Sequence, residues 1–259
     1  MRLYLKYLKM LLKAEMAYRT SFILLSIGQF FVPFTVFIGF AMLFKRFGTI
    51  KGYSFYEMAL CYSVAHFAFA FSECFIRGFD GFSALIREAG FDRLMLRPRN
   101  LALQVLGSRF EFSRIGRIAQ SLIVFAIAFS GLEVTWPWWK SLLLLLMIAG
   151  GSAIFSGIFI LVSTMCFWTV QGTEIANIFT DGGRELSQFP LNIYHSAFQK
   201  FFTFVIPFGM ATYYPLLVLL DRVKPLWFYV VSPLYGLLFL VPCMVIWYQG
   251  VKHYQSCGS

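Results

Sequence analysis

Charged side chains are scarce in this sequence, and they are grouped where they could serve another molecule. Of the 259 residues, 59% are hydrophobic and 13% are charged. Yet residues 90–100, GFDRLMLRPRN, include Asp92, Arg93, Arg97 and Arg99. In protein–protein interfaces, charged residues set the register and apolar residues anchor the contact. The segment therefore predicts either a docking element for another protein or a basic loop that only fixes topology.

A second group of polar residues lies between positions 174 and 188. On a helix, six of them fall within about 100° of arc. They are Glu174, Asn177, Asp181, Arg184, Glu185 and Gln188. The pattern is typical of a solvated surface helix, or of a membrane crossing whose polar side lines a pathway in the protein interior. Both interpretations stay open at this point.

No residues are spaced like a catalytic or metal centre. The sequence contains no Walker motif, no G-x-S-x-G and no H-E-x-x-H. Its three histidines are scattered, and its five cysteines include no C-x-x-C pair. His66 and Glu73 share one helix face, and Glu73 is spaced to pair with Arg77. We therefore predict no catalytic residue, no metal and no cofactor in this chain.

The composition predicts an all-α integral membrane protein. Soluble domains usually carry about 25% charged residues, and the mean hydropathy here is +0.71. The net charge of +10 favours cytoplasmic loops and lipid headgroups over nucleic acid as the reason for the basic excess. Because about 20 apolar residues cross a bilayer, we predict six transmembrane helices. Five of them are Phe22–Phe44, Tyr56–Ile76, Ile115–Leu132, Ser141–Phe167 and Leu226–Tyr248.

The remaining crossing, the fifth along the chain, has two interpretations. Hydropathy alone places it at about 201–220. Alternatively, it lies at about 174–190, with its polar face inside the protein. Pro207 and Pro215 would then break the following apolar run into a re-entrant pair of short helices on the outer side.

Basic residues predict the orientation. Arg2, Lys6, Lys9 and Lys13 fall within about 60° on a helix, so residues 1–19 predict an amphipathic interfacial helix. With both termini inside and the hydropathy assignment of the spans, the inner segments hold 16 of the 22 Lys and Arg residues, as five, eight, two and one along the chain. This bias predicts that both termini are cytoplasmic.

The loop at 78–113 joins the second and third crossings and is rich in arginine. Within it, Phe82–Leu96 predicts a short amphipathic helix, and Pro98 is placed to open a helix that runs on into the third crossing. Arg114 and Arg117, at the start of that crossing, can snorkel toward the headgroups. The residues that we expect to contact a cytoplasmic partner are Arg87, Glu88, Asp92, Arg93 and Arg97.

Several long blocks of the sequence resemble one family. They are GFDRLMLRPRNLALQVLGSRFE, FWTVQGTEIANIFTDGGRELSQFPLNIY, FVIPFGMATYYP and the terminal YQSCGS. In this order, and with the amphipathic N-terminal helix and the charged loop, the chain resembles the type-2 permeases of bacterial ATP-binding cassette exporters, in a branch of unassigned substrate. The resemblance runs over residues 2–259 and implies a single transmembrane permease domain at 1–259.

The resemblance also implies a mechanism. This permease would pair with a second one, a sister chain rather than an identical copy, and an ATPase dimer would dock beneath them with its ATP and magnesium. The loop around Ser83–Arg97 would be the coupling helix. A short fifth helix at 174–190 would precede re-entrant helices at Tyr194–Leu220. Residues that could then line the path are Glu174, Asn177, Asp181, Arg184 and Glu185.

The implied activity is export of an amphipathic or hydrophobic substrate across the bacterial cytoplasmic (inner) membrane. Two other classes remain as alternatives, an intramembrane lipid-modifying enzyme and a non-transporting membrane scaffold. An enzyme would need convergent acid, base or metal groups at membrane depth, and no motif joins those present. Activity of the purified chain alone would favour the enzyme, and a neighbouring reading frame for an ATP-binding cassette protein would favour the permease.

Overall fold

The computed structural model describes the backbone of residues 2–169 and 173–255, and the side chains of residues 4–169 and 178–255. Over these residues the chain is helical and forms no β-strand. Five helical segments are long and apolar enough to cross a membrane. Their long helices are α2 (Arg19–Phe47), α3 (Phe55–Asp80), α7 (Ile115–Gly131), α8 (Trp138–Met165) and α13 (Leu234–Lys252). The prediction of an all-helical membrane protein is thus confirmed.

Helix α3 lies at the centre of the bundle. It packs against α7 on one side and α8 on the other, while α13 covers α8 and α2 covers α7. The α8–α13 contact is close because it is built on glycine. A Cβ at Gly150 would lie 2.4 Å from the carbonyl oxygen of Pro233, and one at Gly236 would lie 2.3 Å from that of Gly150. Small residues of this kind allow the close helix approach common in membranes.

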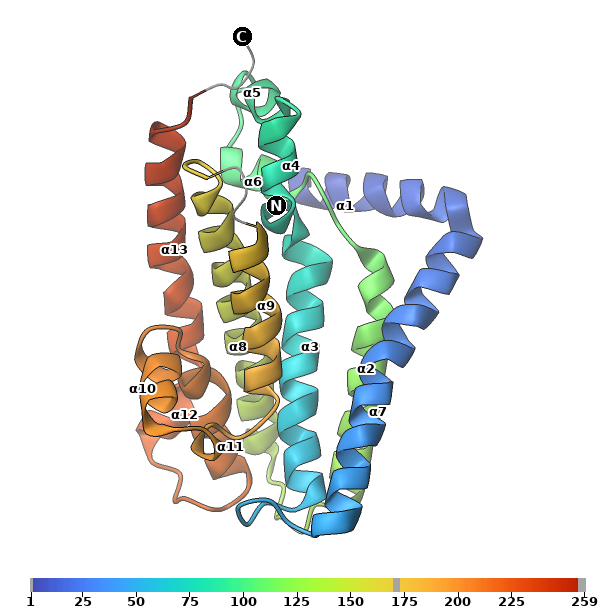
Figure 1. Cartoon of the computed structure of the whole chain (residues 1–259), viewed down its shortest axis with the longest axis vertical. Helices are drawn as coiled ribbons and strands as arrows, with labels where there is room; N and C mark the ends of the chain where they lie inside the picture. The colour runs from blue at the N-terminus through green and yellow to red at the C-terminus, as the bar shows by residue number, and fades with distance from the viewer. Residues whose placement is uncertain (1, 170–172, 256–259) are drawn as a thin grey trace.

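The N-terminal helix α1 (Arg2–Glu15) lies across one end of the bundle, and the short helix η1 (Met16–Tyr18) turns the chain into α2 (Figure 1). Its lysines Lys6, Lys9 and Lys13 are exposed. Its apolar side packs against Phe110 and Phe112, from the segment before α7. The predicted amphipathic helix is therefore present, and part of its apolar surface packs on the protein itself while Leu5 and Met10 stay exposed.

The same end carries the loop between α3 and α7, and the C-terminal end of α13 lies there too (Figure 1). The predicted helix at 82–96 is divided in two, because Ala89 adopts a left-handed φ of 49° that a helix cannot continue through. The prediction that a helix opened at Pro98 runs into the third crossing is wrong, since the helix that follows Pro98 spans only Leu101–Leu106. The loop elements are α4 (Phe82–Arg87), α5 (Gly90–Met95), α6 (Leu101–Leu106) and η2 (Phe112–Arg114).

The segment between α8 and α13 begins with α9 (Thr173–Ser187), which packs beside α8 and α3. A straight crossing over 201–220 is not formed. Helix α10 (Ser196–Phe204) and the helical stretch Gly209–Leu219 meet at 89°, with Pro207 in the break. The remaining elements here are η3 (Leu191–Ile193), η4 (Gly209–Tyr213), α11 (Tyr214–Leu219) and α12 (Trp227–Val231). Helices α10–α12 lie at the end of the bundle opposite α1 (Figure 1).

Candidate functional site

One face of α3 carries polar side chains through the interior of the bundle. This face consists of the polar residues Tyr62, His66 and Glu73 and the aromatic residue Phe69. They follow one another at intervals of four, three and four, so they lie on one side of the helix. All are at most 4% exposed, because α7, α8 and α9 surround this helix. Buried polar groups require partners, and residues of other segments supply them for Glu73 and for His66 Nε2.

Glu73 is the centre of a buried ion cluster. Its carboxylate lies 2.5 Å from the Arg117 guanidinium, 3.1 Å from that of Arg77 and 3.4 Å from that of Arg114. Glu111 adds further pairs, at 2.8 Å to Arg114 and 3.3 Å to Arg77. A charge at this depth is tolerated when opposite charges and hydrogen bonds surround it. The predicted pair of Glu73 and Arg77 is confirmed, within a larger network.

The network also includes α2. The Gln29 side-chain oxygen accepts hydrogen bonds from Arg114 at 2.6 Å and from Arg117 at 2.9 Å. Arg117 is 8% exposed, so the prediction that this pair of arginines snorkels to the headgroups is wrong. The arginines turn inward because Glu73 and Gln29 offer partners that the lipid side of α7 lacks. The cluster thereby joins α2, α3 and α7.

A small polar cavity separates this cluster from α9. Its volume is about 180 Å³. It is lined by Phe69, Glu73, Arg77, Asp80, Arg114, Arg117, Phe159, Thr180 and Asp181. The cavity has room for water or for a small polar group beside the arginines.

Helix α9 adds a second charged group. Arg184 pairs with Asp181 at 3.1 Å and with Glu185 at 2.7 Å. Its guanidinium carbon lies 5.1 Å from the centre of the Phe69 ring, and that of Arg117 lies 5.5 Å from the same centre. Both distances suit cation–π contacts. One aromatic ring of α3 thus links the ion cluster to α9.

Polar contacts continue from α9 to the other end of the α3 face. The Gln188 side-chain nitrogen donates to Glu185 at 2.5 Å, and its oxygen lies 3.3 Å from His66 Nε2. The His66 ring stacks on Tyr62, with 4.0 Å between their centres. A row of polar side chains therefore runs from Glu73 to Tyr62 along the face that α3 turns to α9.

The structure brings together three of the five predicted path residues. The side chain of Arg184 is 18% exposed, whereas those of Asp181 and Glu185 are 55% and 50% exposed. The arginine therefore points into the bundle, and the two acids lie at its surface. Glu174 and Asn177 belong to α9, but their side chains lie outside the described residues.

The predicted partner-binding residues lie at the α1 end of the bundle. Arg87, Glu88, Arg93 and Arg97 are exposed, and Asp92 is half-buried. In the described part of the chain, none of the ion pairs involves one of these four exposed residues. Their charges are thus available to another molecule.

The apolar side chains of Met95 and Leu96 lie among these charges and were not among the predicted contact residues. Leu96 is 85% exposed and Met95 is 45% exposed. A leucine among arginines can be recognised in the sequence. However, the periodicity of an amphipathic helix predicts that such a leucine faces inward. Here α5 ends at Met95, so Leu96 no longer follows the helical pattern.

Core residues hold this exposed loop firmly. The Phe82 ring contacts those of Phe91, Phe167 and Trp247, at 5.0, 5.2 and 6.1 Å between centres. Phe167 follows α8, and Trp247 belongs to α13 and is fully buried. The buried Gln104 side chain donates to two carbonyl oxygens of the loop at 3.2 Å. A force on α5 would therefore reach α8 and α13 through packed side chains.

Comparison with known proteins agrees with this architecture. A family model described as ABC-2 family transporter protein matches residues 30–258. The chain belongs to the ABC-2 transporter family. Comparison with curated proteins and with solved structures found no match. The chain is thus an ABC-2 permease, a membrane transport subunit of a kind that generally works with an ATP-binding cassette ATPase.

Proposed function

We propose that this ABC-2 permease is the non-catalytic membrane subunit of an exporter in the bacterial cytoplasmic membrane, driven by a separate ATPase dimer that carries the ATP and magnesium. The observation that supports this most is the loop at α4–α5. It presents arginines and an exposed leucine outward, and it is fixed inward to α8 and α13. A coupling element needs both properties, because it must bind a moving partner and transmit its motion.

The charge distribution supports an orientation with α1 and the loop helices α4–α6 in the cytoplasm. Helix α1 and the loop at 81–114 carry ten of the 15 Lys and Arg residues outside the five long helices, and positive charge favours the inner side of a membrane. The end of α13 lies at the same end of the bundle (Figure 1). Both termini would thus be cytoplasmic.

We assign α9 as the fifth of six spans and the α10–α11 pair as a re-entrant segment on the outer side. Helix α9 packs along α3 and α8, and its arginine faces the protein interior. The 89° bend between α10 and the following helix returns the chain to the end from which it came. A re-entrant backbone at membrane depth is tolerated when protein buries it, and Thr203, Met210 and Leu216 are buried here.

We assign the polar row of α3 and α9 to the transport path. A second permease would cover the exposed side of this row. The half-exposed Asp181 and Glu185 lie on that side, and charged groups at membrane depth require a partner or water. We propose a sister chain in this place, since the acids would then meet a complementary surface and not their own copies. A polar row flanked by aromatic rings suits an amphipathic or hydrophobic substrate.

Affinity purification of the tagged chain in mild detergent tests the proposal. The expected result is a stoichiometric ATP-binding cassette subunit that is lost when Asp92 and Arg93 are both reversed in charge. The matched control is Lys224→Glu, because Lys224 is exposed at the opposite end and its reversal should leave the complex intact. Recovery of the chain alone, even after crosslinking, would contradict the proposal and favour the enzyme or scaffold alternatives.

A further inference from the structure

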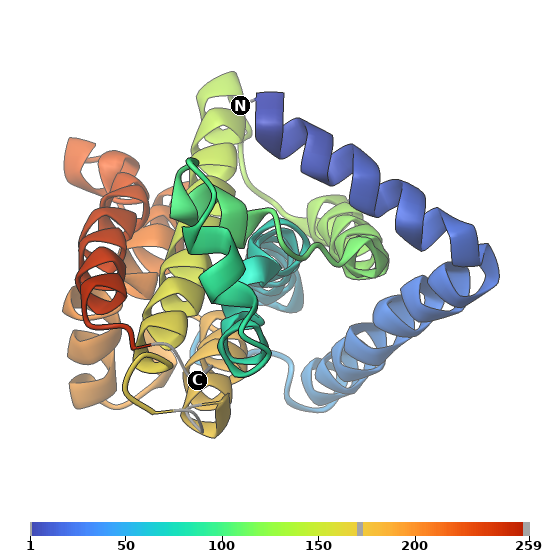
Figure 2. The same ribbon diagram turned by 90° about the horizontal axis from the view of Figure 1, so that it is seen from above.

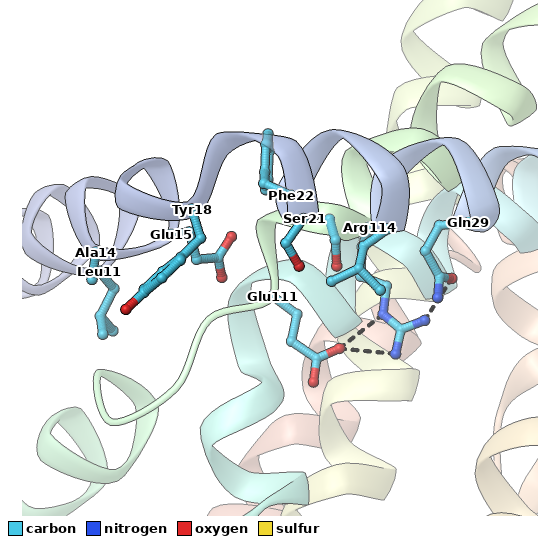
Figure 3. A pocket seen from close by; sticks show the side chains of 11 residues that line it. Leu11, Ala14, Glu15, Tyr18, Ser21, Phe22, Gln29, Glu111 and Arg114 are labelled. Carbon is cyan, nitrogen blue, oxygen red and sulfur yellow. Dashed lines mark hydrogen bonds and ion pairs between the residues drawn. The ribbon is translucent and has the colours of Figure 1, made fainter.

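A large cleft opens where α1 turns into α2, beside the part of the ion cluster formed by Gln29, Glu111 and Arg114. Its volume is about 730 Å³, which is typical of a ligand-binding site. Figure 3 shows it between the α1–α2 turn and the segment that leads into α7. The cleft is lined by Leu11, Ala14, Glu15, Tyr18, Ser21, Phe22, Leu25, Gln29, Glu111, Ser113 and Arg114.

The two carboxylates of the cleft differ in their partners. Glu111 forms ion pairs with Arg77, Arg109 and Arg114. Arg114 and Glu111 already pair at 2.8 Å, and Arg114 also donates to Gln29 at 2.6 Å (Figure 3). Glu15 interacts with the backbone of Phe112, but no described arginine or lysine forms an ion pair with it. The cleft therefore offers one carboxylate to a cation.

Along α2 the wall of the cleft is apolar at Phe22 and Leu25, between the polar residues at the turn and Gln29. Glu15 and Tyr18 lie at the turn, while Phe22 and Leu25 follow further along the spanning helix. Leu25 is 57% exposed. Helix α1 lies across the bundle end (Figure 2), where headgroups meet the acyl region in the proposed orientation. A molecule that fits both parts has a cationic head and an apolar tail.

We infer that this cleft binds an amine-headed phospholipid of the cytoplasmic leaflet, with its ammonium group at the Glu15 carboxylate and an acyl chain along Phe22 and Leu25. The inference rests on the proposed orientation of α1, though not on the ATPase. The Glu15 carboxylate, which forms no ion pair among the described residues, disfavours a purely anionic headgroup beside it. Anionic headgroups instead suit the exposed lysines on α1, Lys6, Lys9 and Lys13.

Native mass spectrometry of the purified full chain tests the inference, with phosphatidylethanolamine or phosphatidylglycerol added at equal concentration. We expect the amine lipid to bind about tenfold more tightly, because a charge-assisted contact contributes at that level. Glu15→Gln should remove the preference and keep the shape of the side chain. Glu133→Gln, at an exposed site at the opposite end, should leave it unchanged.

A second variant tests the tail. Leu25→Trp adds bulk to the cleft wall at a half-exposed position, so the chain should still fold while retention of both lipids falls. Equal binding of the two lipids, or an unchanged preference in Glu15→Gln, would overturn the inference. A change in permease pairing without a change in lipid retention would also overturn it, because another protein chain would then fill the cleft. Since no ATPase is present, failure here leaves the proposed transport function untouched.

Discussion

Arginines at two places in this permease have similar neighbours in sequence and opposite environments in space. Arg77, Arg114 and Arg117 surround Glu73 between α3 and α7 and are largely buried. Arg93 lies on α5 and Arg97 lies just after it, and both are exposed. Each place combines basic and apolar residues. The difference is that the first supplies its own acidic partners, whereas the second leaves its charges for another molecule.

Charges that stabilise the fold and charges that bind a partner can therefore be distinguished by their burial. A buried ion cluster contributes mainly by the cost of breaking it, since each remaining charge would be left without compensation. Exposed charges add little to stability but can steer and orient a partner. Substitutions in the cluster should therefore change folding, and substitutions in the loop should change binding.

The largest expected effect is on stability, in Glu73→Leu. Removing this carboxylate leaves the buried Arg117 without the acid that pairs with it, so the free energy of unfolding should fall by about 3–5 kcal/mol. Denaturant unfolding in mixed micelles measures it. Glu88→Ala, at an exposed loop position, is the matched control and should stay within about 0.5 kcal/mol of the parent. A loss below about 1 kcal/mol in Glu73→Leu would show that the cluster is not structural.

The second effect is on ATPase binding, in Leu96→Asp. This side chain is 85% exposed, so its replacement should leave stability unchanged. If it anchors the contact, affinity for the ATPase should fall about 30-fold or more, as at interface hot spots. Titration of the purified subunits measures the affinity. Unchanged affinity would move the contact away from α5.

A smaller effect is expected in Gln29→Leu. The substitution removes the acceptor of two arginine hydrogen bonds, so the free energy of unfolding should fall by about 1–3 kcal/mol. The same unfolding assay applies, with Gln199→Leu as an amide control in α10. If both variants lose equally little, α2 is held by apolar packing alone.

The smallest effect concerns acid stability. Burial would raise the pKa of Glu111, but the charges of Arg77, Arg114 and Arg109 outweigh it and lower the pKa below its usual value of 4.5. A lowered pKa contributes stability that is complete above the unfolded value and is lost as the pH falls through the folded value. Unfolding followed from pH 7 to below 4.5 should show this loss, and Glu111→Gln should reduce it. An identical pH profile in the variant would exclude Glu111 as the titrating group.

Much of the fold follows from the sequence, because apolar length alone identifies the long helices α2, α3, α7, α8 and α13. The basic loop was equally predictable. The inward orientation of the Arg114 and Arg117 side chains was not predictable. Arginines at the start of a membrane helix can extend to the headgroups or turn inward, and the packing of neighbouring helices decides between the two. Gln29 was missed because one amide in a long apolar run carries no periodic signal.

The region after α8 shows a different limit. Hydropathy favours 201–220 as a crossing, and the polar face of α9 argues against burial. In the structure α9 lies along α3, where Arg184 contacts the Phe69 ring and Gln188, just after the helix, contacts His66. Such compensation depends on residues distant in sequence, so a hydropathy average over one helix does not reveal it.

Site-specific photocrosslinking from position 96 tests most directly the claim that the exposed arginine loop serves an ATPase. The described cysteines Cys61, Cys74, Cys166 and Cys243 are buried. A Leu96→Cys variant in a Cys257→Ser background can therefore carry a benzophenone label, with Lys224→Cys as the control. We predict an adduct at position 96 that mass spectrometry identifies as an ATP-binding cassette subunit, and none at position 224. No adduct at 96, or equal adducts at both positions, would contradict the account.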